Sequence, residues 1–169
     1  MLLLPNESLY MKATFLCLKM EKPIVIMLLG CTRQGKSSLG NVLLGLNPNN
    51  NNEQGFKAAP GSHRVTTVTK AIDGFWLGKK EPSNAMVTPI TVIDTPGYFD
   101  GEGRNKDHSK NLVEAIKKDV DVIHIFLWVK KASDCFTEAD KEFFKLMCDT
   151  FGKDVFTSRT IMILTQWVH

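Results

Sequence analysis

The sequence of 169 residues predicts an α/β fold in which helices cover both faces of a mostly parallel sheet. Its strongly apolar segments are continuous rather than alternating, which is typical of strands buried on both faces. Segments with the helical spacing of apolar residues lie between them. The length suits a single domain, and a hydrophobic content of 43% with 23% charged residues is ordinary for a globular protein.

Four apolar runs are the predicted core strands. They are Ile24–Leu29, Ile90–Ile93, Val120–Val129 and Ile161–Leu164. The segment Val65–Trp76 contains β-branched residues that suit an edge strand, and residues 78–84 are predicted to form a hairpin loop after it.

Three segments are predicted to be helices because their apolar residues recur on one face. They are Lys36–Leu46, Ser109–Lys118 and Glu138–Phe151. The last has the clearest boundaries, since Thr137 is a suitable N-cap, Asp140 follows three residues later, and Gly152 can end the helix.

One domain is predicted over residues 21–169, preceded by a disordered leader at 1–20. The net charge of +3 is only mildly basic and lacks a clustered basic stripe, which predicts no binding to nucleic acid. No apolar run approaches the ~18 residues needed to span a bilayer. Any contact with a membrane would therefore use a segment outside this sequence.

The cysteines and several other polar residues are predicted to be structural. The cysteines are Cys17, Cys31, Cys135 and Cys148. They form no CxxC pair and have no histidine at metal-ligand spacing, so we expect reduced core thiols in a cytoplasmic protein. His124 is predicted to be a hydrogen-bonded core residue, whereas Lys130 and Lys131 are predicted to form a solvated surface.

Residues 30–40, GCTRQGKSSLG, predict a phosphate-binding loop, or P-loop. Gly30, Gly35, Lys36 and Ser37 complete the pattern G-x-x-x-x-G-K-[ST] between an apolar strand and an amphipathic helix. Inward-facing backbone N–H groups and the helix N-terminus suit phosphate groups. We expect Lys36 to contact the β- and γ-phosphates and Ser37 to bind Mg²⁺ through its hydroxyl.

A second motif indicates the GTPase class within P-loop proteins. Asp94-Thr95-Pro96-Gly97 ends an apolar strand, where the Mg²⁺ shell needs a carboxylate from Asp94. Gly97 allows its backbone N–H to approach the γ-phosphate, so the following loop can respond to that phosphate. The two motifs together predict a three-layer P-loop NTPase with Mg²⁺ and GTP or GDP as its ligands.

The motifs resemble those of the GIMAP family, the GTPases of immunity-associated proteins, which are related to septins and chloroplast import GTPases. The resemblance covers about residues 22–165. It is carried by Gly30, Thr32, Gly35–Ser37, Gly40, Asn41, Leu44 and Gly45, by Thr67–Lys70, by Asp94–Gly97 with Phe99 and Asp100, and more loosely by Cys135–Asp140.

The resemblance implies guanine-nucleotide binding and a homodimer or oligomer formed through the G-domain face. It implies that Thr69 is the switch threonine that closes on Mg²⁺, with Thr66 and Thr67 as alternatives, so the metal ligands would be Ser37, Thr69 and Asp94. The expected nucleotide contacts are Gly30, Thr32, Arg33, Gln34, Gly35, Lys36, Ser37, Ser38, Thr69, Gly97 and Thr165.

The chain departs from the family pattern at Arg33 and Gln34, where Gly-Ala is usual. Guanylate-binding proteins and atlastins resemble this chain at Arg33, which leads to the hypothesis of an arginine finger delivered by dimerisation. The alternative is an exposed side chain without a catalytic role. Lys36 and Arg33 are thus the expected catalytic residues, and Tyr98, in place of a water-orienting glutamine, predicts slow hydrolysis by the monomer.

The C-terminal segment departs further. Thr165-Gln166-Trp167-Val168 replaces the [NT]-K-x-D element that selects guanine, with Val168 at the aspartate position. The preference for guanine over adenine therefore depends on the resemblance alone. We expect a G domain truncated before its last strand and helix, which would leave an apolar surface and an unpaired strand edge.

Three functions follow from the sequence. The first is a Mg²⁺-dependent GTPase that is slow as a monomer and faster as a dimer. The second is a nucleotide-gated interaction or scaffold module with little turnover. The third is an inactive fragment of a GTPase.

Overall fold

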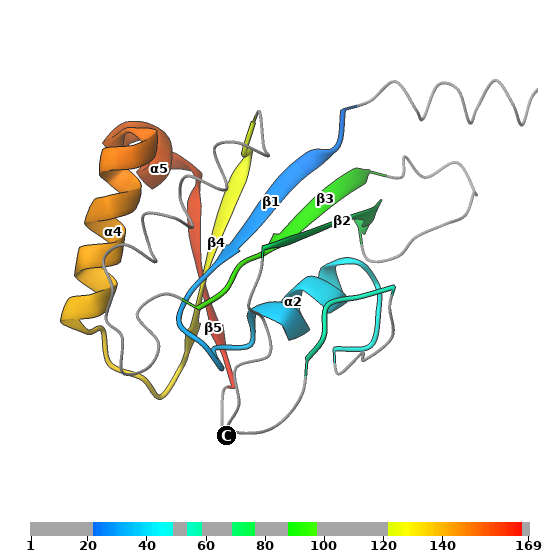
Figure 1. Cartoon of the computed structure of the whole chain (residues 1–169), viewed down its shortest axis with the longest axis horizontal. Helices are drawn as coiled ribbons and strands as arrows, with labels where there is room; N and C mark the ends of the chain where they lie inside the picture. The colour runs from blue at the N-terminus through cyan, green and yellow to red at the C-terminus, as the bar shows by residue number, and fades with distance from the viewer. Residues whose placement is uncertain (1–21, 49–53, 59–68, 77–87, 98–121, 167–169) are drawn as a thin grey trace, which may run out of the picture.

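A computed structural model of the chain describes residues 22–48, 54–58, 69–76, 88–97 and 122–166. These residues form a five-stranded sheet in the order β2-β3-β1-β4-β5 (Figure 1). The strands are β1 (Ile24–Leu29), β2 (Lys70–Phe75), β3 (Pro89–Asp94), β4 (Ile125–Lys131) and β5 (Thr160–Thr165). All neighbouring pairs are parallel except β2 with β3, which confirms the mostly parallel sheet and the predicted edge strand.

In the described part of the chain, three helices accompany the sheet: α2 (Lys36–Leu43), α4 (Glu138–Phe151) and α5 (Lys153–Arg159). The prediction of α4 is confirmed at both ends, because Thr137 and Asp140 form a capping box and Gly152 adopts a φ of 87°. α2 ends earlier than predicted, where Gly45 turns the chain at a φ of 68°. The short helix α5 was not predicted, since its seven residues carry too little periodicity. The leader at 1–20, the helix at 109–118 and the loop at 78–84 lie outside the described residues.

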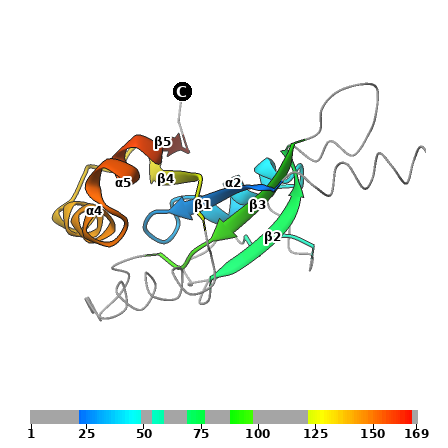
Figure 2. The same ribbon diagram turned by 90° about the horizontal axis from the view of Figure 1, so that it is seen from above.

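Alternate residues of the strands pack on opposite faces of the sheet, which produces three layers. Met27 and Leu29 of β1 belong to a core cluster with α4 and α5, whereas Ile26 and Leu28 belong to a second cluster with α2. Seen from above, α4 and α5 lie at the β4–β5 end of the sheet (Figure 2). Burial on both faces explains why the core strands are continuously apolar in sequence.

One side chain of α2 fixes the segment that follows the helix. Asn41 is fully buried, and its amide exchanges hydrogen bonds with the backbone N–H and C=O of Phe56 at 2.8 and 2.9 Å. A Cβ on Gly40 would lie 2.7 Å from the Phe56 ring, so glycine allows this contact. Lys70 Nζ donates to the Gly55 carbonyl at 2.9 Å. Residues 54–58 are therefore attached to both α2 and β2.

The strand predicted over Val120–Val129 begins later and ends later than expected, as β4. His124 lies just before β4 and is exposed, so its prediction as a core residue is wrong, although its Nδ1 accepts a hydrogen bond from the Val25 N–H at 3.0 Å.

The cysteine prediction is wrong for Cys135, which is exposed in the β4–α4 loop. Cys31 and Cys148 are half-buried free thiols, and Cys17 lies outside the described residues. Burial raises the pKa of the Cys148 thiol, and the Asp149 carboxylate raises it further, while Lys153 opposes the shift. Less of Cys148 is therefore thiolate at neutral pH than of an ordinary cysteine.

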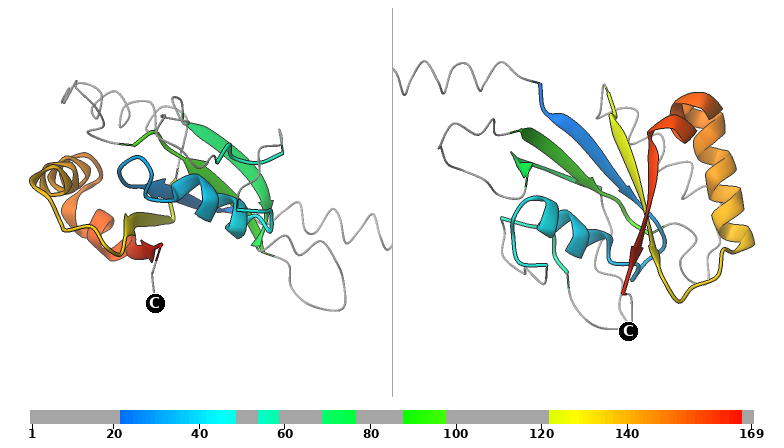
Figure 3. Two further views of the ribbon diagram at one scale, coloured as in Figure 1. Left: turned by 90° about the horizontal axis from the view of Figure 1, so that it is seen from below. Right: turned by 180° about the vertical axis from the view of Figure 1, so that it is seen from behind.

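β5 carries an exposed apolar surface. Ile161, Met162 and Leu164 are each 51% exposed, and within the described residues β5 pairs only with β4. In the view from behind, β5 is the strand at the α4–α5 end of the sheet (Figure 3). Within the described residues, none of the helices has the length and apolar character to cross a bilayer.

The contact between α2 and Phe56 gives the first testable prediction. Asn41→Ala should lower the free energy of unfolding by about 2–4 kcal/mol, because each polar backbone group of Phe56 left buried without a partner costs about 1–3 kcal/mol. Urea denaturation measures the loss. The control is Val42→Ala on the same helix, where a side chain that is 40% exposed should cost about 1 kcal/mol or less. Equal losses in the two variants would contradict the role of Asn41.

Candidate nucleotide-binding site

The predicted site residues gather at the carboxyl edge of the parallel strands. β1, β3, β4 and β5 end at the same edge, and β1 lies between β3 and β4. Open α/β sheets bind ligands at such an edge, where the chain turns to opposite sides of a central strand. Residues 30–35, 95–97, 132–137 and 166 follow these four strand ends, and Asp94, Lys131 and Thr165 are the last residues of their strands.

The P-loop departs from β1 through a contact that only glycine permits. Gly30 has a φ of 143°, and a Cβ there would lie 2.2 Å from the Val129 carbonyl oxygen of β4. Arg33 and Gly35 have left-handed φ angles of 63° and 90°. The left-handed conformation costs a non-glycine residue roughly 1–2 kcal/mol, so the surroundings of Arg33 must hold it there.

The loop ends at the first turn of α2, whose backbone donors suit an anion. Gly35 is the N-cap and has no side chain to bond the first N–H groups of the helix, which is the arrangement that suits a phosphate. Lys36 is 6% exposed, and its Nζ donates to the Cys31 carbonyl at 2.8 Å. The ammonium group is thus held against the loop. Thr32 and Ser38 are half-buried in the same segment.

Ser37 and Asp94 meet directly, although 57 residues separate them in sequence. The Ser37 hydroxyl donates to Asp94 Oδ2 at 2.6 Å, and Asp94 is 1% exposed at the end of β3. A hydroxyl and a carboxylate are hard oxygen donors, the type that Mg²⁺ prefers. The described residues contain no group of three or more His, Cys, Asp or Glu that could bind a metal. The Ser37 hydroxyl and the Asp94 carboxylate fit Mg²⁺, because this ion commonly takes its remaining ligands from water and phosphate.

The antiparallel pairing of β2 brings Thr69 to the same edge. Lys70 pairs with Asp94 across β2 and β3, so Thr69, one residue earlier, lies beyond the Asp94 end of the strand. Thr69 is half-buried, and Gly97 is buried after β3. Thr66 and Thr67 lie outside the described residues, as do Tyr98, Phe99 and Asp100, so the choice of switch threonine stays a prediction.

The end of β5 contacts the P-loop backbone. Thr165 Oγ1 donates to the Gln34 carbonyl at 2.6 Å, and Gln166 Nε2 donates to the Arg33 carbonyl at 3.1 Å. Thr165 therefore supports the loop that would hold the phosphates, and its predicted contact with the nucleotide stays a prediction. Trp167 and Val168 lie outside the described residues.

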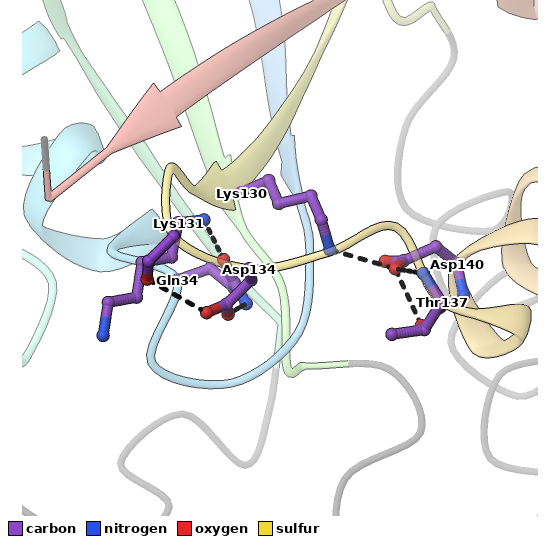
Figure 4. A network of polar contacts seen from close by, with 7 residues as sticks. Gln34, Lys130, Lys131, Asp134, Thr137 and Asp140 are labelled. Carbon is purple, nitrogen blue, oxygen red and sulfur yellow. Dashed lines mark hydrogen bonds and ion pairs between the residues drawn. The ribbon is translucent and has the colours of Figure 1, made fainter.

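Gln34 and Arg33 differ in burial. Gln34 is 7% exposed, and its Nε2 donates to Asp134 Oδ2 at 2.8 Å while its Oε1 accepts from the Lys131 N–H (Figure 4). Arg33 is exposed. Sequence reasoning missed Asp134, because it lies in a loop 100 residues from Gln34 and belongs to no periodic pattern.

The prediction of a solvated surface at Lys130 is wrong. Lys130 is 6% exposed, and its Nζ lies 3.0 Å from Asp140 Oδ2 (Figure 4). The same Nζ lies 5.6 Å from the centre of the Phe136 ring. The same carboxylate oxygen accepts the N–H and the hydroxyl of Thr137, both at 2.7 Å. The lysine is buried because the capping carboxylate of α4 is buried and requires a positive partner. Lys131 is half-buried.

The fold and the loop define a P-loop nucleotide-binding domain of the G-domain type. Residues 24–167 match the sequence model of the AIG1 family. The chain belongs to the AIG1 family.

Solved structures agree with this fold. Toc33 from Arabidopsis thaliana in complex with GDP and Mg²⁺ superimposes with a TM-score of 0.61 at 23% identity, covering 95% of this chain and 57% of that chain. Toc33 in complex with Mg²⁺ and GMPPNP gives a TM-score of 0.62 at 24% identity with the same coverage. This chain therefore spans somewhat more than half the length of these proteins. At such identities the likeness shows the fold.

The buried ion pair gives the second prediction. Lys130→Met should lower the free energy of unfolding by about 3–5 kcal/mol, because it leaves the Asp140 carboxylate buried without its counter-charge. Lys141→Met is the matched control, since Lys141 pairs with Glu138 at 2.6 Å but the two side chains are 60% and 83% exposed. Such a surface pair contributes about 1 kcal/mol or less. Chemical denaturation measures the free energy of unfolding of both variants. A loss of about 1 kcal/mol or less in Lys130→Met would show that Asp140 does not need Lys130 as its counter-charge.

Proposed function

We propose that this domain binds GTP and GDP with Mg²⁺ and hydrolyses GTP slowly, faster when two copies associate. The observation that carries the proposal is the hydrogen bond between Ser37 and Asp94 beside the buried Lys36. A serine at the start of α2 and a carboxylate at the end of β3 are the two protein groups that a Mg²⁺–nucleotide site requires.

Five residues would contact the phosphates or Mg²⁺ in the proposed function. Lys36 would neutralise charge on the β- and γ-phosphates, and Ser37 and Asp94 would hold Mg²⁺. Thr69 would contribute a further ligand for Mg²⁺ in the triphosphate state, and the Gly97 N–H would contact the γ-phosphate. Mg²⁺ would supply charge neutralisation at the phosphates.

Membership of the AIG1 family and the nucleotides named for the Toc33 structures support guanine as the base. The Gly40-Asn41 pair supports a GIMAP-type member, because both residues match the GIMAP sequence pattern. We also propose a cytoplasmic location.

Arg33 supports a catalytic contribution from a second copy. Its backbone is held by Gln166, and its side chain is exposed at the P-loop. Dimerization is important for the GTPase activity of the chloroplast translocon components atToc33 and psToc159. This chain covers 57% of the similar structure from that pair. In this chain, association would let Arg33 reach a transferred phosphoryl group.

Binding gives the third prediction. The purified chain should bind fluorescent GTP and GDP in the presence of Mg²⁺ more tightly than fluorescent ATP. Lys36→Ala should weaken GTP binding by about 100-fold or more, because the phosphates lose a charge-assisted contact. Lys145→Ala, which removes an exposed lysine of α4, is the control and should bind as the wild type does. Equal binding by Lys36→Ala, or tighter binding of ATP, would overturn the proposal.

Turnover gives the fourth prediction and separates the GTPase from a scaffold. The rate per molecule should rise with protein concentration, and Arg33→Ala should lower the rate at high concentration by about 1,000-fold or more, the contribution of an arginine finger. Its affinity for GDP should stay within about 3-fold of the wild type. A rate that is independent of both concentration and Arg33 would instead support a nucleotide-gated scaffold with little turnover.

A further inference from the structure

Gln34 occupies a position in the P-loop where its side chain cannot serve the nucleotide, because both ends of its amide are used elsewhere. The Nε2 group donates to Asp134 Oδ2 at 2.8 Å, and Oε1 accepts from the Lys131 N–H (Figure 4). Lys131 is the last residue of β4, and Asp134 lies in the connection between β4 and α4. A residue of the P-loop is thus attached, through a buried side chain, to a loop about 100 positions away in sequence.

The backbone around Gln34 is held as well. Its carbonyl accepts the Thr165 hydroxyl at 2.6 Å, and the carbonyl of Arg33 accepts from Gln166 Nε2 at 3.1 Å. These bonds from the end of β5 and the amide bonds to the β4–α4 loop act on the same stretch. The left-handed φ of 63° at Arg33 lies within it.

The other end of residues 132–137 is fixed to α4. Thr137 and Asp140 form the capping box, and Lys130 pairs with the same buried carboxylate. Asp134 lies between these anchors and the P-loop, and the loop exposes Cys135 and Phe136. A rearrangement of the P-loop at residue 34 would therefore act directly on this exposed loop.

We propose that Gln34 is a positioning residue that couples the P-loop to residues 132–137 and raises the affinity for the phosphates of the nucleotide. This inference rests on the proposed function. Backbone N–H groups bind an anion best when they are already oriented, and a P-loop without this anchor must be ordered during binding. The coupling is reciprocal, so nucleotide binding must also stabilise residues 131–134.

An exchange of the two partners tests the proposal. Gln34→Glu places a carboxylate against the Asp134 carboxylate and should weaken GDP binding by about 10- to 100-fold. Asp134→Asn keeps an acceptor oxygen for Gln34 but loses its charge, and should weaken binding by about 3-fold. The double variant restores the bond in reverse, since the new amide at position 134 can donate to the new carboxylate at position 34, and should recover to within about 3-fold of the wild type. Glu138→Gln, at a side chain that is 83% exposed, is the control with unchanged binding.

Rescue by the double variant is the decisive result, because it requires that residues 34 and 134 affect nucleotide binding through their contact with one another. The urea midpoints of all variants are measured beside the affinities. A double variant that binds as weakly as Gln34→Glu overturns the proposal. A Gln34→Glu variant that binds GDP as the wild type does overturns it too.

Hydrogen exchange of the Lys131 amide provides a readout that needs no nucleotide. The amide should exchange faster in Gln34→Ala than in the wild type, and added GDP should slow the exchange of residues 131–134 only in the wild type. A wild-type chain that binds neither GDP nor GTP overturns the proposed function. In that case, amide exchange without nucleotide still tests whether Gln34 anchors the Lys131 amide. Equal exchange rates in the wild type and in Gln34→Ala would overturn the anchor.

Discussion

The close approach of β1 and β4 at Gly30 is the constraint on which the site depends. The carbonyl of Val129 occupies the space that a Cβ on Gly30 would need, at 2.2 Å. The P-loop can therefore begin at the centre of the sheet, within reach of the strands on both sides. Ser37 meets Asp94 from β3 on one side, and Gln34 meets Lys131 and Thr165 from β4 and β5 on the other. A bulkier residue at 30 would separate the loop from both groups.

The loop is held mainly by side chains that lie outside it. Asp94 after β3, Asp134 after β4, and Thr165 and Gln166 at the end of β5 each bond a P-loop residue. A flexible loop would pay for its ordering each time it bound an anion, whereas a loop already held in place does not. The strained backbone at Arg33 persists for the same reason, because its neighbours determine its conformation.

The sequence predicted the parts of this structure that have a local or periodic signal. The continuous apolar runs predicted four strands, the capping box and Gly152 predicted the two ends of α4, and the glycine-rich motif placed the P-loop between β1 and α2. The prediction for Lys130 was wrong because its burial depends on Asp140. The periodicity of apolar residues does not reveal that this capping residue is buried. The hydrogen bond from Gln34 to Asp134 joins residues 100 positions apart. It depends on β1 and β4 being neighbours in the sheet, and no local sequence pattern reveals the order of the strands. The apolar surface of β5 agrees with the expectation of an uncovered edge.

Arg33 and Gln34, which replace Gly-Ala in the motif, differ in their surroundings. Gln34 is buried and fixes the loop, whereas Arg33, which has a left-handed φ of 63°, is exposed. A finger delivered by a second copy needs an arginine whose backbone is fixed and whose side chain is exposed, because a mobile backbone would lose the geometry that stabilises charge. Arg33 has both properties, and it has them because Gln34 and Gln166 hold the loop around it. Under the proposed function, the anchor that favours binding of the phosphates is thus the same one that fixes the backbone of the proposed finger.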